Sequence, residues 1–180
     1  MPWEINFLNG IQSIRSSFLD NFIKIYTNLG STVAIIAIIV LLLVFKKTRR
    51  VGIDCAVTLI LGLLLGNLLL KHTIMRQRPY FDPAALVNQM SLIIKDPVGL
   101  SFPSGHTIGS FDVAFTIFLN NKKWGTVALI IAATIAFSRM YLFVHFPTDI
   151  IEGILVAAIA SILTVYIIKP FYKKLADKIA

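Results

Sequence analysis

Five long apolar stretches divide the sequence, and each is about as long as a helix that crosses a bilayer. A membrane-spanning helix needs about 20 mainly apolar residues. The stretches are residues 25–45, 51–70, 104–121, 124–143 and 148–168. We therefore predict an all-α polytopic membrane helical bundle with about five transmembrane helices, built as a single domain over residues 1–180.

Residues 4–24 have a different pattern, because charged positions interrupt the apolar ones. Apolar side chains recur at helical spacing at Leu8, Ile11, Ile14, Phe18, Phe22 and Ile25. A helix with one apolar face and one charged face is suited to lie in the membrane interface. We expect an N-terminal interfacial amphipathic helix here rather than the alternative, a sixth and poorly hydrophobic span. The acidic start without a basic lead does not indicate a cleavable signal peptide.

The composition excludes most soluble classes of protein. Hydrophobic residues make up 57% of the chain and charged residues 14%, whereas soluble domains have about 25% charged residues. The single cysteine, Cys55, has no partner within the chain, which excludes a disulfide scaffold. A net charge of +8 would suggest nucleic acid in a soluble protein. In an apolar chain it indicates basic membrane-flanking loops, so we expect no nucleic-acid partner.

Basic residues are concentrated in alternate connections between the stretches. Residues 46–50, residues 122–123 and the C-terminal tail together hold ten of the 17 Lys and Arg residues. The positive-inside rule places these three segments in the cytoplasm. Residues 71–103 and 144–147 then face outward. The pattern predicts a multi-pass cell-membrane protein with a cytoplasmic C-terminus.

The outward segments contain three groups of polar residues that are unusual at membrane depth. These groups are Lys71 with Arg78 and Pro79, then Pro103-Ser104-Gly105-His106, then Ser138 and Arg139 with His145 and Asp149. Taken alone, a lysine can complement a helix C-terminus and an arginine can be an ordinary loop charge. Three cations at one level of the membrane, Lys71, Arg78 and Arg139, indicate instead that an anion is bound there.

The second group has the pattern of a helix start. Ser104 can cap the helix, and Gly105 lets a ligand approach the free N–H groups of the first turn. The alternative is a capped helix in which His106 is a bystander.

His145 and Asp149 are four residues apart, and we expect both in the first turn of the fifth helix, on one face. A carboxylate that holds one ring nitrogen leaves the other free to attack. The alternative is a polar pair satisfied at the membrane interface.

Together the three groups resemble the signature of the type 2 phosphatidic acid phosphatase family, which shares its core site with vanadium-dependent haloperoxidases. The signature is Lys-x6-Arg-Pro, Pro-Ser-Gly-His and Ser-Arg-x5-His-x3-Asp. It is complete and in order in this chain, and the resemblance extends over about residues 51–168.

The resemblance implies roles for eight residues. His145 would be the nucleophile that forms a phosphohistidine, Asp149 would orient it, and His106 would be the general acid and base. The groups that would hold the phosphoryl oxygens are Lys71, Arg78, Arg139, the Ser104 hydroxyl and the Gly105 amide. No cofactor or metal is implied, so the resemblance predicts an enzyme that is independent of Mg²⁺ and resistant to EDTA.

The resemblance further implies a bacterial lipid phosphatase whose site lies on the extracytoplasmic side. The favoured substrate is undecaprenyl diphosphate, and phosphatidylglycerophosphate and phosphatidate are the alternatives. Composition argues against a soluble haloperoxidase. A lipid-binding or transport protein with a dead site is the alternative outside enzymes, although His106, His145 and Asp149 are all present. The oligomeric state cannot be read from the sequence.

Several polar residues lie outside the signature. Asp112 is expected to be a buried, hydrogen-bonded acid about 12 Å deeper than Ser104 along the third helix, and Glu152 to be structural or paired with Arg139. Asp54, near the cytoplasmic end, is expected to reach water. Arg76 neighbours the first motif without belonging to it. Residues 82–100 are expected to cover the site as a re-entrant segment.

Overall fold

All the regular elements in the described part of the chain are helices. The computed structural model describes residues 2–82, 92–95, 97 and 99–179. The α-helices are α1 (Pro2–Gln12), α2 (Ser17–Tyr26), α3 (Thr32–Val44), α4 (Arg49–Leu63), α5 (Lys71–Ile74), α7 (Gly105–Asn120), α8 (Lys122–Tyr141), α9 (Pro147–Ile162) and α10 (Lys169–Ile179). Short 3-10 or π segments are η1 (Thr27–Gly30), η2 (Leu64–Leu70), η3 (Pro79–Phe81) and η4 (Leu163–Ile168). The predicted all-α bundle is confirmed.

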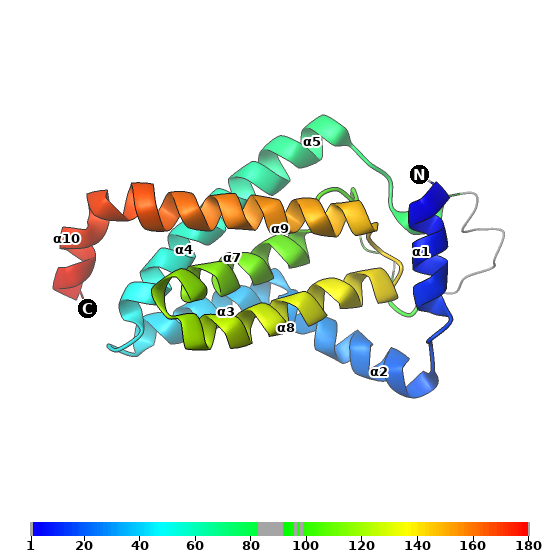
Figure 1. Cartoon of the computed structure of the whole chain (residues 1–180), viewed down its shortest axis with the longest axis horizontal. Coiled ribbons are helices and arrows are strands. Elements are labelled where there is room, and N and C mark those ends of the chain that lie inside the picture. Colours follow the sequence, from blue (N-terminus) through cyan, green and yellow to red (C-terminus); the bar gives the residue numbers. More distant parts are fainter. Residues whose placement is uncertain (1, 83–91, 96, 98, 180) are drawn as a thin grey trace.

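Helix α7 is the centre of the bundle. It packs against α3, α4, α8 and α9, which run alongside it in Figure 1. Most of its side chains are buried, whereas the outer helices expose large apolar residues such as Val33 (79%), Ile130 (61%) and Ile151 (54%). Apolar faces of this kind require lipid rather than water around them.

Three helical stretches are long and apolar enough to cross a membrane, namely Arg49–Phe81, Lys122–Tyr141 and Pro147–Lys174. A fourth is reached if the pair Ser17–Gly30 and Thr32–Val44, bent by 54°, forms one span. The central helix α7 has 16 residues. The membrane bundle is therefore established, and the count of five spans stays a prediction.

The first predicted span, residues 25–45, is broken at Gly30 and Ser31. A methyl group on Gly30 would lie 2.5 Å from the Ile135 side chain, so only glycine allows η1 to approach α8 this closely. Ser31 then caps α3 by accepting a hydrogen bond from the Ala34 backbone at 3.3 Å. The chain bends here because a close contact and a new cap coincide.

Residues 4–24 form two helices rather than the single helix that the periodicity predicts. Helix α1 lies across one end of the bundle (Figure 1) and buries Ile5, Leu8 and Ile11 against residues 141–146. The chain turns after α1, and Ser16 caps α2. The later positions of the predicted apolar stripe are exposed, with Phe18 at 78%. The predicted apolar stripe is thus divided between two helices. Helix α1 packs on the end of the bundle, and α2 is the first part of the bent stretch Ser17–Gly30 and Thr32–Val44.

Substituting Gly125 by Ala is expected to destabilise the bundle, because the methyl group would lie 2.0 Å from Cα of Phe118 on α7. Overpacking of this kind costs about 1–3 kcal/mol. The matched control is Gly10→Ala in α1, where no described residue lies within 4 Å of the added methyl group. Thermal unfolding in detergent should give a lower midpoint for G125A only. An unchanged midpoint for G125A would contradict the close contact between α7 and α8.

Candidate active site

The polar residues singled out in the sequence gather at the end of the bundle that α1 covers. Arg139 lies in the last turn of α8, His145 in the turn that follows, and Asp149 in the first turn of α9. Arg78 immediately precedes η3, and Ser104 caps the start of α7. Three separate segments of the chain, around Arg78, around Ser104 and over residues 139–149, therefore contribute to one region.

Asp149 is completely buried, and donors from several segments meet its carboxylate. The Phe146 backbone N–H donates to Oδ2 at 2.8 Å, which caps α9, and the Ser101 hydroxyl donates to the same oxygen. Arg76 Nη1 donates to Oδ1 at 3.0 Å. A buried carboxylate is tolerated only when its oxygens are satisfied in this way.

His145 is 3% exposed and lies between an acid and a cation. Its Nδ1 is 3.5 Å from Asp149 Oδ2, and its Nε2 accepts from Arg78 Nη1 at 3.2 Å. The ring therefore carries its proton on Nδ1, toward the carboxylate, and keeps a lone pair on Nε2. His145 precedes α9 instead of lying in its first turn as expected, yet the turn still brings it to Asp149.

The three basic side chains of the site differ in how many of their N–H groups donate hydrogen bonds to the protein. Arg78 is buried and donates from Nε to Gly99 O at 2.9 Å and from Nη1 to Val144 O at 3.0 Å. Arg139 is also buried and donates from Nη1 to Thr27 Oγ1 at 2.8 Å, while its Nε has no hydrogen-bond partner among the described residues. Lys71 is half-buried and close enough to Arg78 for their like charges to interact. The charges of Arg78 and Arg139 both act on the ring of His145.

The start of α7 completes the region. Ser104 is buried and accepts from the Thr107 N–H at 3.4 Å and from the Thr107 hydroxyl at 2.9 Å, so its own proton remains to be donated. A side chain on Gly105 would meet only Asn67 Oδ1, at 3.9 Å, so a ligand can approach the backbone there. His106 is within electrostatic range of Arg78, Arg139 and His145.

Sequence reasoning missed a polar network that joins α1 to this region. Glu4 is fully buried, pairs with Arg76 Nη2 at 2.5 Å and accepts from the Thr148 hydroxyl at 2.6 Å. Arg76 also lies over the Phe146 ring, 3.7 Å from its centroid. Burial opposes ionisation of Glu4, but the bonds from Thr148 and Arg76 prevail and hold its pKa below the usual value. The only available signal was an acid in an apolar segment.

Three expectations outside the motifs have different outcomes. Asp112 is buried against Gly62, but its carboxylate oxygens have no partner among the described residues, so the hydrogen-bonded acid is not found. No ion pair between Glu152 and Arg139 is recorded for the described part of the chain. The predicted cover falls largely on residues 83–91, 96 and 98, which lie outside the described residues. The neighbouring Leu92 packs against the cluster formed by α1 and residues 141–146.

Comparison with known proteins identifies the class. The PAP2 superfamily model matches residues 52–173. The chain is 32% identical over 150 residues to the undecaprenyl-diphosphatase of Sulfolobus acidocaldarius, covering 83% of this chain and 70% of the relative. The structure of Aquifex aeolicus LpxE is similar, with a TM-score of 0.78 and 25% identity over 91% of this chain and 94% of that one. The transmembrane PAP2-type phosphatidylglycerolphosphate phosphatase of Bacillus subtilis gives a TM-score of 0.73 and 25% identity over 97% and 86%.

The chain belongs to the PAP2 superfamily. It is accordingly a multi-pass helical membrane protein and a phosphatase, which confirms the resemblance drawn from the three motifs.

Arg76→Gln is expected to lower phosphatase activity about 10–100-fold, mainly through kcat, because Asp149 loses a donor that fixes its position relative to His145. The control is Arg15→Gln, which removes the 2.9 Å ion pair with Asp20. Both variants are assayed for kcat and KM, and their thermal midpoints are measured alongside. Equal activity in R76Q and R15Q would contradict a positioning role for Arg76.

The lowered pKa of His145 predicts how the stability of the protein depends on pH. Burial is the largest cause and lowers the pKa of His145 from 6.5 to about 4. The hydrogen bond to Asp149 opposes this shift, and the charges of Arg139 and Arg78 add to it. Between these values the unfolded chain binds a proton that the folded protein does not, so stability falls as the pH falls through this window, by up to about 3 kcal/mol. The thermal midpoint of His145→Asn should therefore decline less on acidification than that of the wild type. The control His72→Asn, at an exposed site, should show the same dependence of the midpoint on pH as the wild type. The same dependence in all three proteins would refute the assignment of this pH effect to His145.

Proposed function

We propose that the chain hydrolyses a lipid phosphate or diphosphate through a phosphohistidine at His145, and that its substrate is undecaprenyl diphosphate. The observation that carries the proposal is the position of His145. Its Nδ1 faces Asp149 and its Nε2 faces a cation that can bind a phosphoryl oxygen. A buried imidazole oriented by a carboxylate, with an unprotonated second nitrogen that a phosphoryl group can approach in place of the Arg78 contact, is the arrangement that nucleophilic catalysis requires.

The reaction proceeds in two displacements. His145 Nε2 attacks the terminal phosphorus, the bond from phosphorus to the bridging oxygen breaks, and His106 gives a proton to that leaving oxygen. Water then attacks the phosphohistidine, His106 takes a proton from it, and the N–P bond breaks. The products are undecaprenyl phosphate and inorganic phosphate. His106 thus acts first as the acid and then as the base.

Three cations take the role that a metal ion has in many phosphatases. Lys71, Arg78 and Arg139, with the Ser104 hydroxyl and the Gly105 amide, hold the phosphoryl oxygens. Fixed donors aimed at developing charge stabilise a transition state without further reorganisation. The unpartnered Nε of Arg139 supports this role. We therefore propose a reaction that needs no metal.

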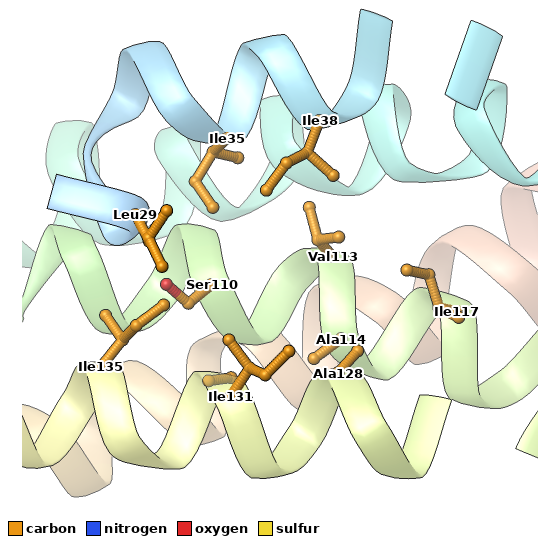
Figure 2. Close-up of a pocket in the computed structure, with 11 residues that line it drawn as sticks. Leu29, Ile35, Ile38, Ser110, Val113, Ala114, Ile117, Ala128, Ile131 and Ile135 are labelled. Carbon is orange, nitrogen blue, oxygen red and sulfur yellow. The ribbon is translucent and has the colours of Figure 1, made fainter. Parts of the chain in front are cut away.

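An apolar groove supports a substrate with a long hydrocarbon chain. The groove has a volume of about 280 Å³ and lies between α3, α7 and α8, lined by residues such as Ile38, Val113 and Ile131 (Figure 2). At one end it includes Ser110 and Ile135. A methyl group on Gly30 would meet these two side chains and His106 Cδ2, the last at 3.3 Å. The groove therefore begins beside the proposed general acid.

The second candidate substrate is phosphatidylglycerophosphate, which the similarity to the Bacillus subtilis enzyme favours. Phosphatidate presents the same phosphoryl group and stays a third possibility. We further propose that the site faces the extracytoplasmic side of a bacterial cell membrane. The support is the positive-inside rule. Ten of the 17 Lys and Arg residues lie in residues 46–50, in residues 122–123 and in the C-terminal tail, away from the proposed site.

Phosphate release in detergent tests the proposal. The wild type should hydrolyse undecaprenyl diphosphate faster than phosphatidylglycerophosphate or phosphatidate, and should keep its activity in EDTA. His145→Ala and His106→Ala should each lose at least about 100-fold, since each removes a step of the mechanism. Unchanged phosphate release in both variants would refute the mechanism, and loss of activity in EDTA would refute metal independence. Faster hydrolysis of another lipid would refute undecaprenyl diphosphate as the preferred substrate.

A further inference from the structure

A second polar cavity lies at the opposite end of the bundle from His145. Its volume is about 370 Å³, and its lining residues come from α4, the segment before it, the end of α7 and α10. These parts of the chain lie at the left in Figure 1. We call it the basic cavity. Its charged and hydroxyl-bearing lining residues are Lys47, Arg50, Asp54, Lys169, Tyr172 and Lys173.

The single acid of the basic cavity already has its partners. Asp54 Oδ2 accepts from Lys169 Nζ at 2.6 Å, and Oδ1 accepts from the Tyr172 hydroxyl at 2.7 Å. Asp54 is 1% exposed, so the expectation that it reaches water is wrong. Since Lys169 balances its charge, the positive charge of Lys47 and Lys173 is left in excess among the described lining residues. A polar cavity with this balance favours an anion.

An apolar groove opens directly beside the basic cavity. This second groove has a volume of about 410 Å³ and shares Lys47 and Val51 with the cavity. Its other walls include Leu42, Ile117 and Trp124, from α3, α7 and α8. A small inorganic anion would use only the cavity. A molecule with an anionic head and a hydrocarbon chain would use both.

We propose that the basic cavity and the adjoining groove bind an anionic phospholipid. Its phosphate lies among Lys47, Arg50 and Lys173, and one acyl chain lies in the groove. Basic pockets between helices at a membrane surface attract such lipids. Trp124 is 64% exposed and Phe171 88% exposed at this end, as aromatic residues at a membrane boundary commonly are.

The consequence is a lipid site separate from the candidate active site. The bound lipid holds α10 to α4 and to the segment before it, because its phosphate contacts residues of all three. Binding should therefore raise the thermal stability of the protein whether or not the proposed substrate is correct.

The experiment titrates purified protein in detergent with phosphatidylglycerol and records the unfolding midpoint. Phosphatidylcholine with the same acyl chains and inorganic phosphate are the parallel arms. The test variant is Lys47→Gln with Lys173→Gln, and the matched control is Lys46→Gln with Lys174→Gln, which removes the same charge from neighbouring positions that do not line the cavity.

Phosphatidylglycerol should raise the midpoint of the wild type and of K46Q/K174Q, and its apparent affinity should weaken about tenfold or more in K47Q/K173Q. K47R/K173R keeps the charge and should bind phosphatidylglycerol as the wild type does. This result would show that the weaker binding of K47Q/K173Q comes from the lost charge and not from misfolding. Equal weakening in both glutamine pairs would reduce the site to general surface charge and overturn the proposal. So would an equal response to phosphatidylcholine or to inorganic phosphate.

Discussion

The end of the bundle that holds the candidate active site depends on the satisfaction of one buried carboxylate, that of Asp149. Its oxygens meet the Phe146 backbone, the Ser101 hydroxyl, the Arg76 guanidinium and the ring of His145. Burying this group without its donors would cost several kcal/mol. Because the donors come from segments far apart in the sequence, satisfying the carboxylate also sets the positions of those segments. The orientation of His145 is a by-product of the same requirement.

A membrane bundle concentrates such requirements at its two ends. Between the ends, apolar faces are stable in lipid and need only close packing, as at Gly125 of α8 beside α7. At the ends, each polar group needs a partner or a ligand. At one end, Arg139 Nε has no hydrogen-bond partner among the described residues, and at the other Lys47 and Lys173 line a cavity beside the paired Asp54. The basic residues at the two ends thus form separate groups.

The N-terminal helix α1 is part of the end of the bundle that holds the candidate active site. Its apolar residues cover the turn that carries His145, and its buried Glu4 holds Arg76 and Thr148. The break at Gly30 has a similar effect, because it brings Thr27 to Arg139. Two irregularities in the N-terminal region thus position two guanidinium groups. An uninterrupted span would supply neither contact.

The sequence by itself determined the helical membrane class, the limits of the later helices and the family. Apolar length, caps and motif spacing are local properties, so Ser104 at the start of α7 and Pro147 at the start of α9 could be recognised directly. Only the tertiary structure decided the break at Gly30, the division of residues 4–24, and the contacts of Glu4, Arg76, Ser101 and Thr27 with the site. Those contacts join residues separated by 48 to 144 positions. Periodicity describes which face of one helix is apolar, and it carries no information about which distant polar group will satisfy a buried charge.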